Sequence, residues 1–254
     1  MSDRQSVEFV IPVLNEERGL PVSIQKLHGF LVDNFKDYDW RIVVADNGST
    51  DRTPLIVEEI SKKHGEVGYL RLEERGRGRA LRTAWLASDA DYLCYMDVDL
   101  STELEAIPRL IDSLASQGFD LAIGSRLKKG AKVVGRSLKR EIISRGYNLI
   151  VWSLFFVNFQ DAQCGFKAIT RKAAHELAPL VEDNSWFFDT ELLIVAEKNG
   201  YRINEIPVEW TDDPDSRVKI VKTASDDMKG LLRIRFGGLK WASKRLKGRA
   251  TQRA

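Results

Sequence analysis

Tyr92-Leu93-Cys94-Tyr95-Met96-Asp97-Val98-Asp99 is an apolar and aromatic run that ends in two carboxylates. Its length and composition predict a buried strand. Because side chains two positions apart on a strand point the same way, we expect Asp97 and Asp99 on one side of its end. Two hard oxygen ligands there suit Mg²⁺ or Mn²⁺ bound to a diphosphate. The structural alternative is that one of them caps a helix beginning near Thr102.

Around this strand, short β-branched runs alternate with longer amphipathic stretches. Strands are predicted at Val7–Val13, Trp40–Ala45, Val67–Leu72, Asp91–Met96 and Phe119–Ile123. The alternation predicts an α/β protein of Rossmann-like type, with a mainly parallel central sheet flanked by helices. Ligands bind such sheets at the carboxyl ends of the strands. The first candidates for a site are therefore Asn15-Glu16-Glu17, Asp46–Asp51 and Asp97-Val98-Asp99.

The pattern changes after Gly124. Five features follow in order: a basic loop (Arg126–Arg140), a long helix to about Phe159, a glycine-centred segment (Asp161–Lys167), a helix (Asp189–Lys198) and a strand (Tyr201–Ile206). No repeat or Pro/Gly/Ser linker interrupts the chain. We therefore expect one domain over residues 1–220 and a basic amphipathic C-terminal segment over residues 221–254. Apolar residues of this segment, Leu231 among them, are expected to contact a membrane, and Gly237-Gly238 is expected to divide it into two short helices.

Composition narrows the class of protein. With 254 residues and 43% hydrophobic content, the chain can bury an ordinary core, and its formal charge of +2 does not suggest nucleic-acid binding. Two cysteines form no disulfide framework, and the N-terminus lacks the apolar run of a signal peptide, so a cytoplasmic protein is expected. The apolar stretch Tyr147–Phe159 is shorter than the roughly 20 residues that span a bilayer. It is expected to lie on a membrane surface.

Other polar segments have both structural and functional interpretations. Asp46–Asp51 fits a tight turn with helix caps, and equally a carboxylate that binds a base or a ribose hydroxyl. Glu74–Arg79 offers two glycines and three guanidinium groups suited to phosphate, or a solvated basic turn. The three histidines, His28, His64 and His175, have no clustered partner in the sequence and are interpreted as structural.

Several ordered motifs resemble those of glycosyltransferase family 2. They are Val10–Glu17, Val43–Asp51, Asp97–Ser101 and Gly124–Arg126. Four later motifs are similar to dolichyl-phosphate glucosyltransferases and dolichol-phosphate mannose synthases: Arg140–Arg145, Asp161–Lys167, Trp186–Glu191 and Glu205–Trp210. The form Gln163-Cys-Gly-Phe-Lys167 leans toward the glucosyl branch. The resemblance covers about Val7 to Lys219 and implies a GT-A type fold.

The resemblance also implies residue roles. The nucleotide sugar, UDP-glucose or GDP-mannose, is expected to contact Pro12, Leu14, Asn15, Glu16, Asp46, Arg77, Asp97 and Val98. The metal is expected on Asp97 and Asp99, and the acceptor phosphate on Arg126, Arg140 and Arg145. The catalytic group would comprise Asp97, Asp99, Arg126 and Asp189. Two departures from the family are Ser101, which leaves the third metal ligand open, and Asn47, where a second Asp is usual.

The function implied is inverting transfer of a hexose, glucose before mannose, to a polyprenyl phosphate on the cytoplasmic face of a membrane. Because a phosphate monoester has its second pKa near about 6, its oxygen is already ionised at neutral pH and needs positioning more than a base. Two alternatives use the same donor residues. One is a soluble transferase acting on a small phosphorylated acceptor, and the other is a non-catalytic membrane subunit that binds sugar nucleotides.

Overall fold

A seven-stranded sheet forms the centre of the structure, a computed structural model that describes residues 4–212 and 220–253. Its strands are β1 (Ser6–Val13), β2 (Asp39–Asp46), β3 (Val67–Arg71), β4 (Tyr92–Met96), β5 (Leu121–Ser125), β7 (Phe166–Thr170) and β8 (Ile203–Pro207). They lie in the order β3-β2-β1-β4-β7-β5-β8, and only the pairs made by β7 are antiparallel. The predicted α/β class and mainly parallel sheet are confirmed.

The strand β7 is absent from the sequence prediction. It enters the sheet between β4 and β5 and pairs Lys167 with Tyr95 and Phe166 with Met96. Its first two residues, Phe166 and Lys167, were expected to belong to the glycine-centred segment, of which only 161–165 is irregular. Because β7 runs against β4, its beginning lies beside the end of β4. Gly165 is thereby placed next to Asp97, and Lys167 is placed beside Tyr95.

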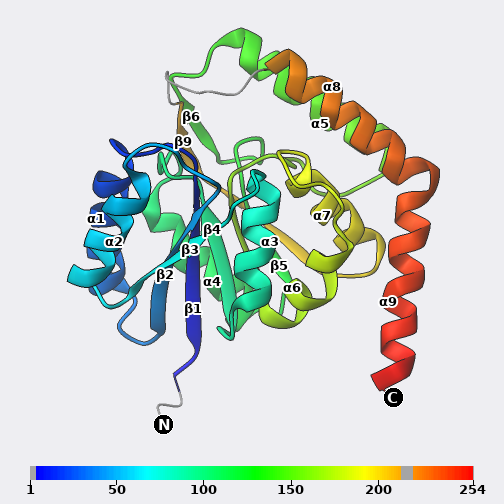
Figure 1. Ribbon diagram of the computed structural model, residues 1–254. Helices are drawn as coiled ribbons and strands as arrows, with labels where there is room; N and C mark the ends of the chain where they lie inside the picture. Colours follow the sequence, from blue (N-terminus) through cyan, green and yellow to red (C-terminus); the bar gives the residue numbers. More distant parts are fainter. Residues whose placement is uncertain (1–3, 213–219, 254) are drawn as a thin grey trace.

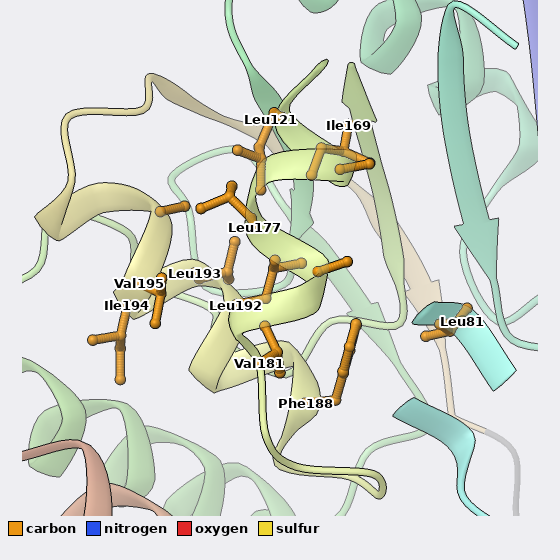
Figure 2. Packing of buried hydrophobic residues seen from close by; sticks show 14 of the residues in the cluster. Leu81, Leu121, Ile169, Leu177, Val181, Phe188, Leu192, Leu193, Ile194 and Val195 are labelled. Carbon is orange, nitrogen blue, oxygen red and sulfur yellow. The ribbon is translucent and has the colours of Figure 1, made fainter. Parts of the chain in front are cut away.

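Helices cover both faces of the sheet (Figure 1). One face carries α1 (Leu20–Asn34), α2 (Thr53–Lys63) and α4 (Ile107–Ala115), preceded by the short helix η1 (Leu104–Ala106). The other carries α3 (Arg77–Ala87), α6 (Arg171–Leu177), η2 (Ala178–Leu180) and α7 (Phe188–Lys198), whose packing Figure 2 shows. Strand alternation divides the core, since Phe9 and Ile11 join the first layer while Val10 joins the second.

The predicted basic loop contains regular structure. Strand β6 (Lys132–Val134) pairs in parallel with β9 (Glu209–Thr211) in a separate two-stranded sheet. The long helix is α5 (Leu138–Phe155), which begins where the Ser137 side chain accepts a hydrogen bond from the Arg140 backbone N–H. It ends at Phe155, four residues before the predicted end at Phe159, because the next residue, Phe156, has a φ of 52°. Of the described helices, none is both long and apolar enough to cross a bilayer.

Two helices form the C-terminal segment. They are α8 (Ile220–Arg233) and α9 (Leu239–Arg253), joined by the turn η3 (Ile234–Gly238) with a break at Gly237, as the Gly237-Gly238 pair predicts. Leu231, Ile234 and Ala242 are buried in the core, so this segment packs on the domain. The expectation that Leu231 contacts a membrane is therefore wrong. The predicted boundary at residue 220 adjoins 213–219, which lies outside the described residues, and it stays a prediction.

Candidate active site

The carboxylate pair lies in a turn after β4. The strand ends at Met96, and the Leu100 N–H donates to the Asp97 carbonyl at 3.1 Å, with Leu100 in the left-handed region at a φ of 49°. Asp97 and Asp99 therefore lie beyond the strand, and their placement on one side of its end stays a prediction. The capping alternative is wrong, because η1 has no side-chain cap. Asp97 is half-buried, and Asp99 is exposed.

Arg77 occupies the space between two of the predicted site carboxylates. Its Nη2 lies 2.6 Å from Asp97 Oδ1, and its Nη1 lies 2.8 Å from Asp189 Oδ2. The guanidinium also lies over the rings of Tyr95 and Trp186, 5.1 Å from each centroid. Burial opposes its charge, yet Asp97 and then Asp189 hold the pKa of Arg77 well above its usual value. The residue is therefore a permanent cation beside the carboxylate pair.

Lys167 and Tyr95 complete this network, and sequence reasoning missed both as site residues. Lys167 Nζ lies 3.1 Å from Asp189 Oδ1, to which the Tyr95 hydroxyl also donates. Burial would raise the pKa of Asp189, but Lys167 and then Arg77 lower it, so the group remains a carboxylate. A lysine inside the apolar run Phe166–Thr170 was the available signal, because a buried lysine needs a partner.

The loops after β1 and β2 are joined by hydrogen bonds. The Asn15 N–H donates to Ser49 Oγ at 2.9 Å, and Asn15 Oδ1 accepts from the Thr50 N–H at 2.8 Å. The Glu16 N–H donates to Thr53 Oγ1 at 2.8 Å. Asn15 has a φ of 57°, which an Asn adopts more readily than most residues. Two segments predicted to bind the nucleotide sugar are thus brought together at one edge of the sheet.

The other predicted donor-site residues surround these loops. Pro12 is buried within β1 opposite Ala45, Leu14 follows the strand, and the Val98 carbonyl accepts a hydrogen bond from Ser23 Oγ. Asp46 is fully buried: its Oδ1 accepts from the Ser49 N–H at 2.9 Å and its Oδ2 accepts from the Tyr69 hydroxyl at 2.8 Å.

Asn47 joins the loop after β2 to the start of α3. Its Oδ1 accepts a hydrogen bond from the Gly76 N–H. Gly76 has a φ of 152° and immediately precedes Arg77, the first residue of α3. The loop after β2 therefore holds the residue that places Arg77. This link connects the predicted nucleoside site with the predicted diphosphate site.

The predicted acceptor arginines are held by carboxylates. Arg126 donates to the fully buried Asp161 through Nε and Nη2, each at 2.8 Å. Burial would raise the pKa of Asp161, but Arg126 outweighs it and lowers that pKa to about 2. Arg140 Nη1 lies 2.6 Å from Asp212 Oδ1. Arg145 Nε lies 2.6 Å from Glu141 Oε1. Arg140 and Arg145 both lie in the N-terminal half of α5.

A fourth arginine, Arg136, belongs to this group and was not predicted. Its Nη1 lies 3.0 Å from Glu141 Oε2, so Glu141 also bridges it to Arg145. The guanidinium groups of Arg126 and Arg136 both contact the Trp210 ring, at 5.4 Å and 5.6 Å from its centroid. Burial opposes the charge of Arg126, but Asp161 and, more weakly, Asp97 raise its pKa. The basic cluster thus adjoins the carboxylate pair.

Helix α5 continues from the basic cluster with an exposed apolar stripe. The stripe consists of Leu138, Ile142, Leu149, Trp152 and Phe156, whose spacings place them on one side of the helix. Arg145 occupies the middle of the same side. The opposite side buries Val151 and Phe155 in the core. One set of apolar residues on this helix therefore packs on the domain, and the other set faces solvent.

A parallel sheet with joined donor loops and a carboxylate turn at its carboxyl edge is the architecture of a GT-A glycosyltransferase. The chain belongs to glycosyltransferase family 2, because the profile described as Glycosyl transferase family 2 matches residues 8–178. It is an enzyme of the glycosyltransferase class.

Individual proteins support this assignment. The chain is 36% identical over 222 residues to glycosyltransferase AglD of Haloferax volcanii, covering 85% of this chain but 35% of that protein. It is 32% identical over 232 residues to the dolichyl-phosphate beta-glucosyltransferase of Drosophila melanogaster, covering 86% and 71%. The fold matches glucosyl-3-phosphoglycerate synthase of Mycobacterium tuberculosis, solved with Mn²⁺, UDP and phosphoglyceric acid, with a TM-score of 0.69, 19% identity and coverage of 92% and 79%.

Proposed function

We propose that the protein transfers a hexose from a nucleotide sugar to a polyprenyl phosphate at a membrane surface, with inversion at the anomeric carbon. Glucose is the favoured sugar and mannose the next. The observation that carries this proposal is the continuity from Asp97 through the arginine cluster to the exposed apolar stripe of α5. Donor groups, phosphate-binding groups and a lipid-compatible surface follow one another. Relatives about 30% identical are named dolichyl-phosphate beta-glucosyltransferases, which agrees with this choice.

The donor end would use the joined loops and the carboxylates. Asn15, Glu16 and Asp46 frame a nucleoside site, while Arg77 supplies a fixed positive charge for the diphosphate. Asp97 and Asp99 would hold Mg²⁺ or Mn²⁺, because paired hard oxygens in a half-exposed turn fit either ion. The bound ion would neutralise charge on the leaving nucleotide.

The acceptor end would use the arginine cluster. Arg126, Arg140 and Arg145 would orient the lipid phosphate at the N-terminal end of α5, where the helix dipole also favours an anion. The attacking phosphate oxygen carries its charge at neutral pH and requires no base. The ionised Asp189 would accept hydrogen bonds from sugar hydroxyls. These roles support a single displacement.

The test is a product assay. Purified protein is incubated with UDP-glucose or GDP-mannose, Mg²⁺ or Mn²⁺, and a short polyprenyl phosphate, and the product is identified by mass and its anomer by NMR. The expected product is a hexosyl polyprenyl phosphate of inverted configuration, formed poorly by Asp99→Asn. Transfer to phosphoglycerate without lipid would favour the soluble alternative. Donor binding with no turnover on either acceptor would favour the non-catalytic one.

A further inference from the structure

Two histidines and a glutamate, His28, His64 and Glu66, meet beside α1 and the end of α2. These two helices cover one face of the sheet (Figure 1). His28 lies in the middle of α1, and His64 and Glu66 lie between the end of α2 and the start of β3. The rings of His28 and His64 have centroids 4.3 Å apart, so the prediction that the histidines have no clustered partner is wrong for these two. The connection from α2 to β3 lies at the amino ends of the strands, opposite the carboxyl edge.

The ligand atoms already converge. One nitrogen from each histidine and one Glu66 oxygen all lie within 4.8 Å of one another. Tetrahedral Zn²⁺ places its ligand atoms about 3.4 Å apart, given bonds of about 2.0–2.2 Å. Small side-chain rotations would close that difference. Glu66 is exposed and His64 is partly exposed, so an ion can reach the cluster from solvent.

His28 Nε2 is an unsatisfied atom aimed at this cluster. It is buried without a hydrogen-bond partner among the described residues, and its nearest anionic atom, Glu66 Oε2, lies 3.5 Å away. A buried polar atom without a hydrogen bond costs free energy, and a bound cation is one group that would satisfy it. Trp40 packs against His28 with ring centroids 5.4 Å apart and fixes that ring. His64 and Glu66 are held relative to each other, because the His64 carbonyl accepts from the Val67 N–H at 3.0 Å.

We propose that His28, His64 and Glu66 bind a divalent transition metal ion such as Zn²⁺. Imidazole nitrogen with one carboxylate is a donor set of borderline softness, which suits Zn²⁺, Co²⁺ or Ni²⁺ better than Mg²⁺. The ion would join α1 to the end of α2. These helices begin at the two donor loops, since α1 follows Glu17 and α2 follows Asp51 closely. The metal would therefore stabilise the pair of helices that carries the nucleotide-sugar loops.

The experiment compares Zn²⁺ with Mg²⁺ by calorimetric titration and thermal unfolding, on full-length protein without a histidine tag. Zn²⁺ is expected to bind and raise Tm, reversibly on chelation, while Mg²⁺ does not reproduce the shift. His64→Gln and Glu66→Gln should each weaken Zn²⁺ binding by roughly 100-fold or more. Losing a group that only orients a metal ligand already costs about 10- to 100-fold, and these two residues are proposed as the ligands themselves. His175→Gln, on α6, and Asp99→Asn, in the carboxylate turn, are the controls and should keep the shift.

Co²⁺ supplies a second readout, because its visible absorption reports imidazole and carboxylate ligation directly. The spectrum should match a low-coordinate nitrogen and oxygen site in wild type and vanish in both cluster variants. Glu66 is exposed, so its replacement tests the site without a folding defect. Wild-type protein that binds no Zn²⁺, or a cluster variant that retains wild-type Zn²⁺ affinity, would overturn the proposal.

Discussion

Arg77 Nη2 lies 2.6 Å from Asp97 Oδ1, whereas Asp99 is exposed. The two carboxylates of the turn therefore differ in what their removal costs. Asp99→Asn should lower turnover roughly 100-fold, since losing one electrostatic stabiliser commonly costs about 3 kcal/mol. Its free energy of unfolding should change by only about 0.5 kcal/mol, as for other surface substitutions. Asp97→Asn should lower both, because it leaves the buried Arg77 short of an anion.

Steady-state kinetics with Mg²⁺ or Mn²⁺ and denaturant unfolding check both variants. Wild type should lose turnover when the divalent cation is withdrawn. If Asp99→Asn kept full activity in the presence of chelator, the metal assignment would be wrong. Equal stability of the two variants would show that the Arg77 contact contributes nothing to the fold.

Gly165 lies against the carboxylate of Asp97, beside Oδ2, whereas Arg77 binds Oδ1. A Cβ at this position would overlap Asp97 Oδ2 and its carboxyl carbon, so Gly165→Ala must displace the carboxylate. Turnover should fall by about 100-fold through the loss of the correctly placed ligand. Gly146→Ala is the matched control, because its Cβ meets no atom within 4 Å and it lies within α5. A Gly165→Ala variant with wild-type kinetics would show that the position of Asp97 is not critical.

The sequence predicted most of the sheet because each parallel strand has a local apolar signal. It did not predict β7, since that strand depends on pairing with β4 and β5, far away in the chain. The same pairing explains the missed site residues. Lys167 reaches Asp189 only because β7 enters the sheet beside Tyr95, and no spacing between residues 95, 167 and 189 encodes that contact. The turn at Asp97 also depended on tertiary contacts, including the Ser23 hydrogen bond to Val98.

Asp227 gives a pH dependence to stability. It is buried on α8, its Oδ2 accepts from Gln163 Nε2 at 2.8 Å, and burial and then Asp183 raise its pKa to about 7. An unfolded Asp loses its proton near about pH 4. Between these values only the folded state retains the proton, so the free energy of unfolding falls as pH rises.

Asp227→Asn removes this charge and should gain stability relative to wild type as pH rises. The difference in free energy of unfolding should grow by about 1 kcal/mol or more between about pH 4 and about pH 8. Denaturant unfolding at several pH values measures it. Asp33→Asn, at an exposed position on α1, is the control. Parallel pH profiles for wild type and Asp227→Asn would contradict the prediction.

The arginines at the start of α5 should act on the acceptor and not on the donor. Lysine cannot reproduce the bidentate fork of guanidinium, so Arg140→Lys and Arg145→Lys should raise the KM for polyprenyl phosphate by about tenfold. The KM for the nucleotide sugar should stay unchanged, as measured by titrating each substrate at saturation of the other. Arg171→Lys, an exposed arginine paired with Asp91, is the control. Unchanged lipid kinetics in both variants would remove these residues from the acceptor site.

Membrane association should depend on exposed apolar side chains of α5. Truncation after Asp227 is a poor test, because it removes Leu231, Ile234 and Ala242 from the core. The better variant is the triple replacement of Leu149, Trp152 and Phe156 by Gln, which leaves the buried side of the helix intact. Burying one large apolar side chain gains about 1.5–3 kcal/mol, so the triple variant should bind vesicles at least about 100-fold more weakly.

Co-sedimentation with anionic vesicles measures this binding. Wild-type binding should also weaken as salt is added, since each nearby cation contributes at most about 1 kcal/mol of electrostatic attraction to the vesicle. The double replacement of Val22 and Leu55 by Gln is the control, because both are exposed apolar residues on α1 and α2. The control should bind as wild type does. Replacing Phe236 and Trp241, exposed in the C-terminal segment, tests whether that segment adds a second contact. If the α5 triple variant kept its vesicle affinity, the stripe would not be the membrane contact, and the lipid would have to approach the arginine cluster from another side.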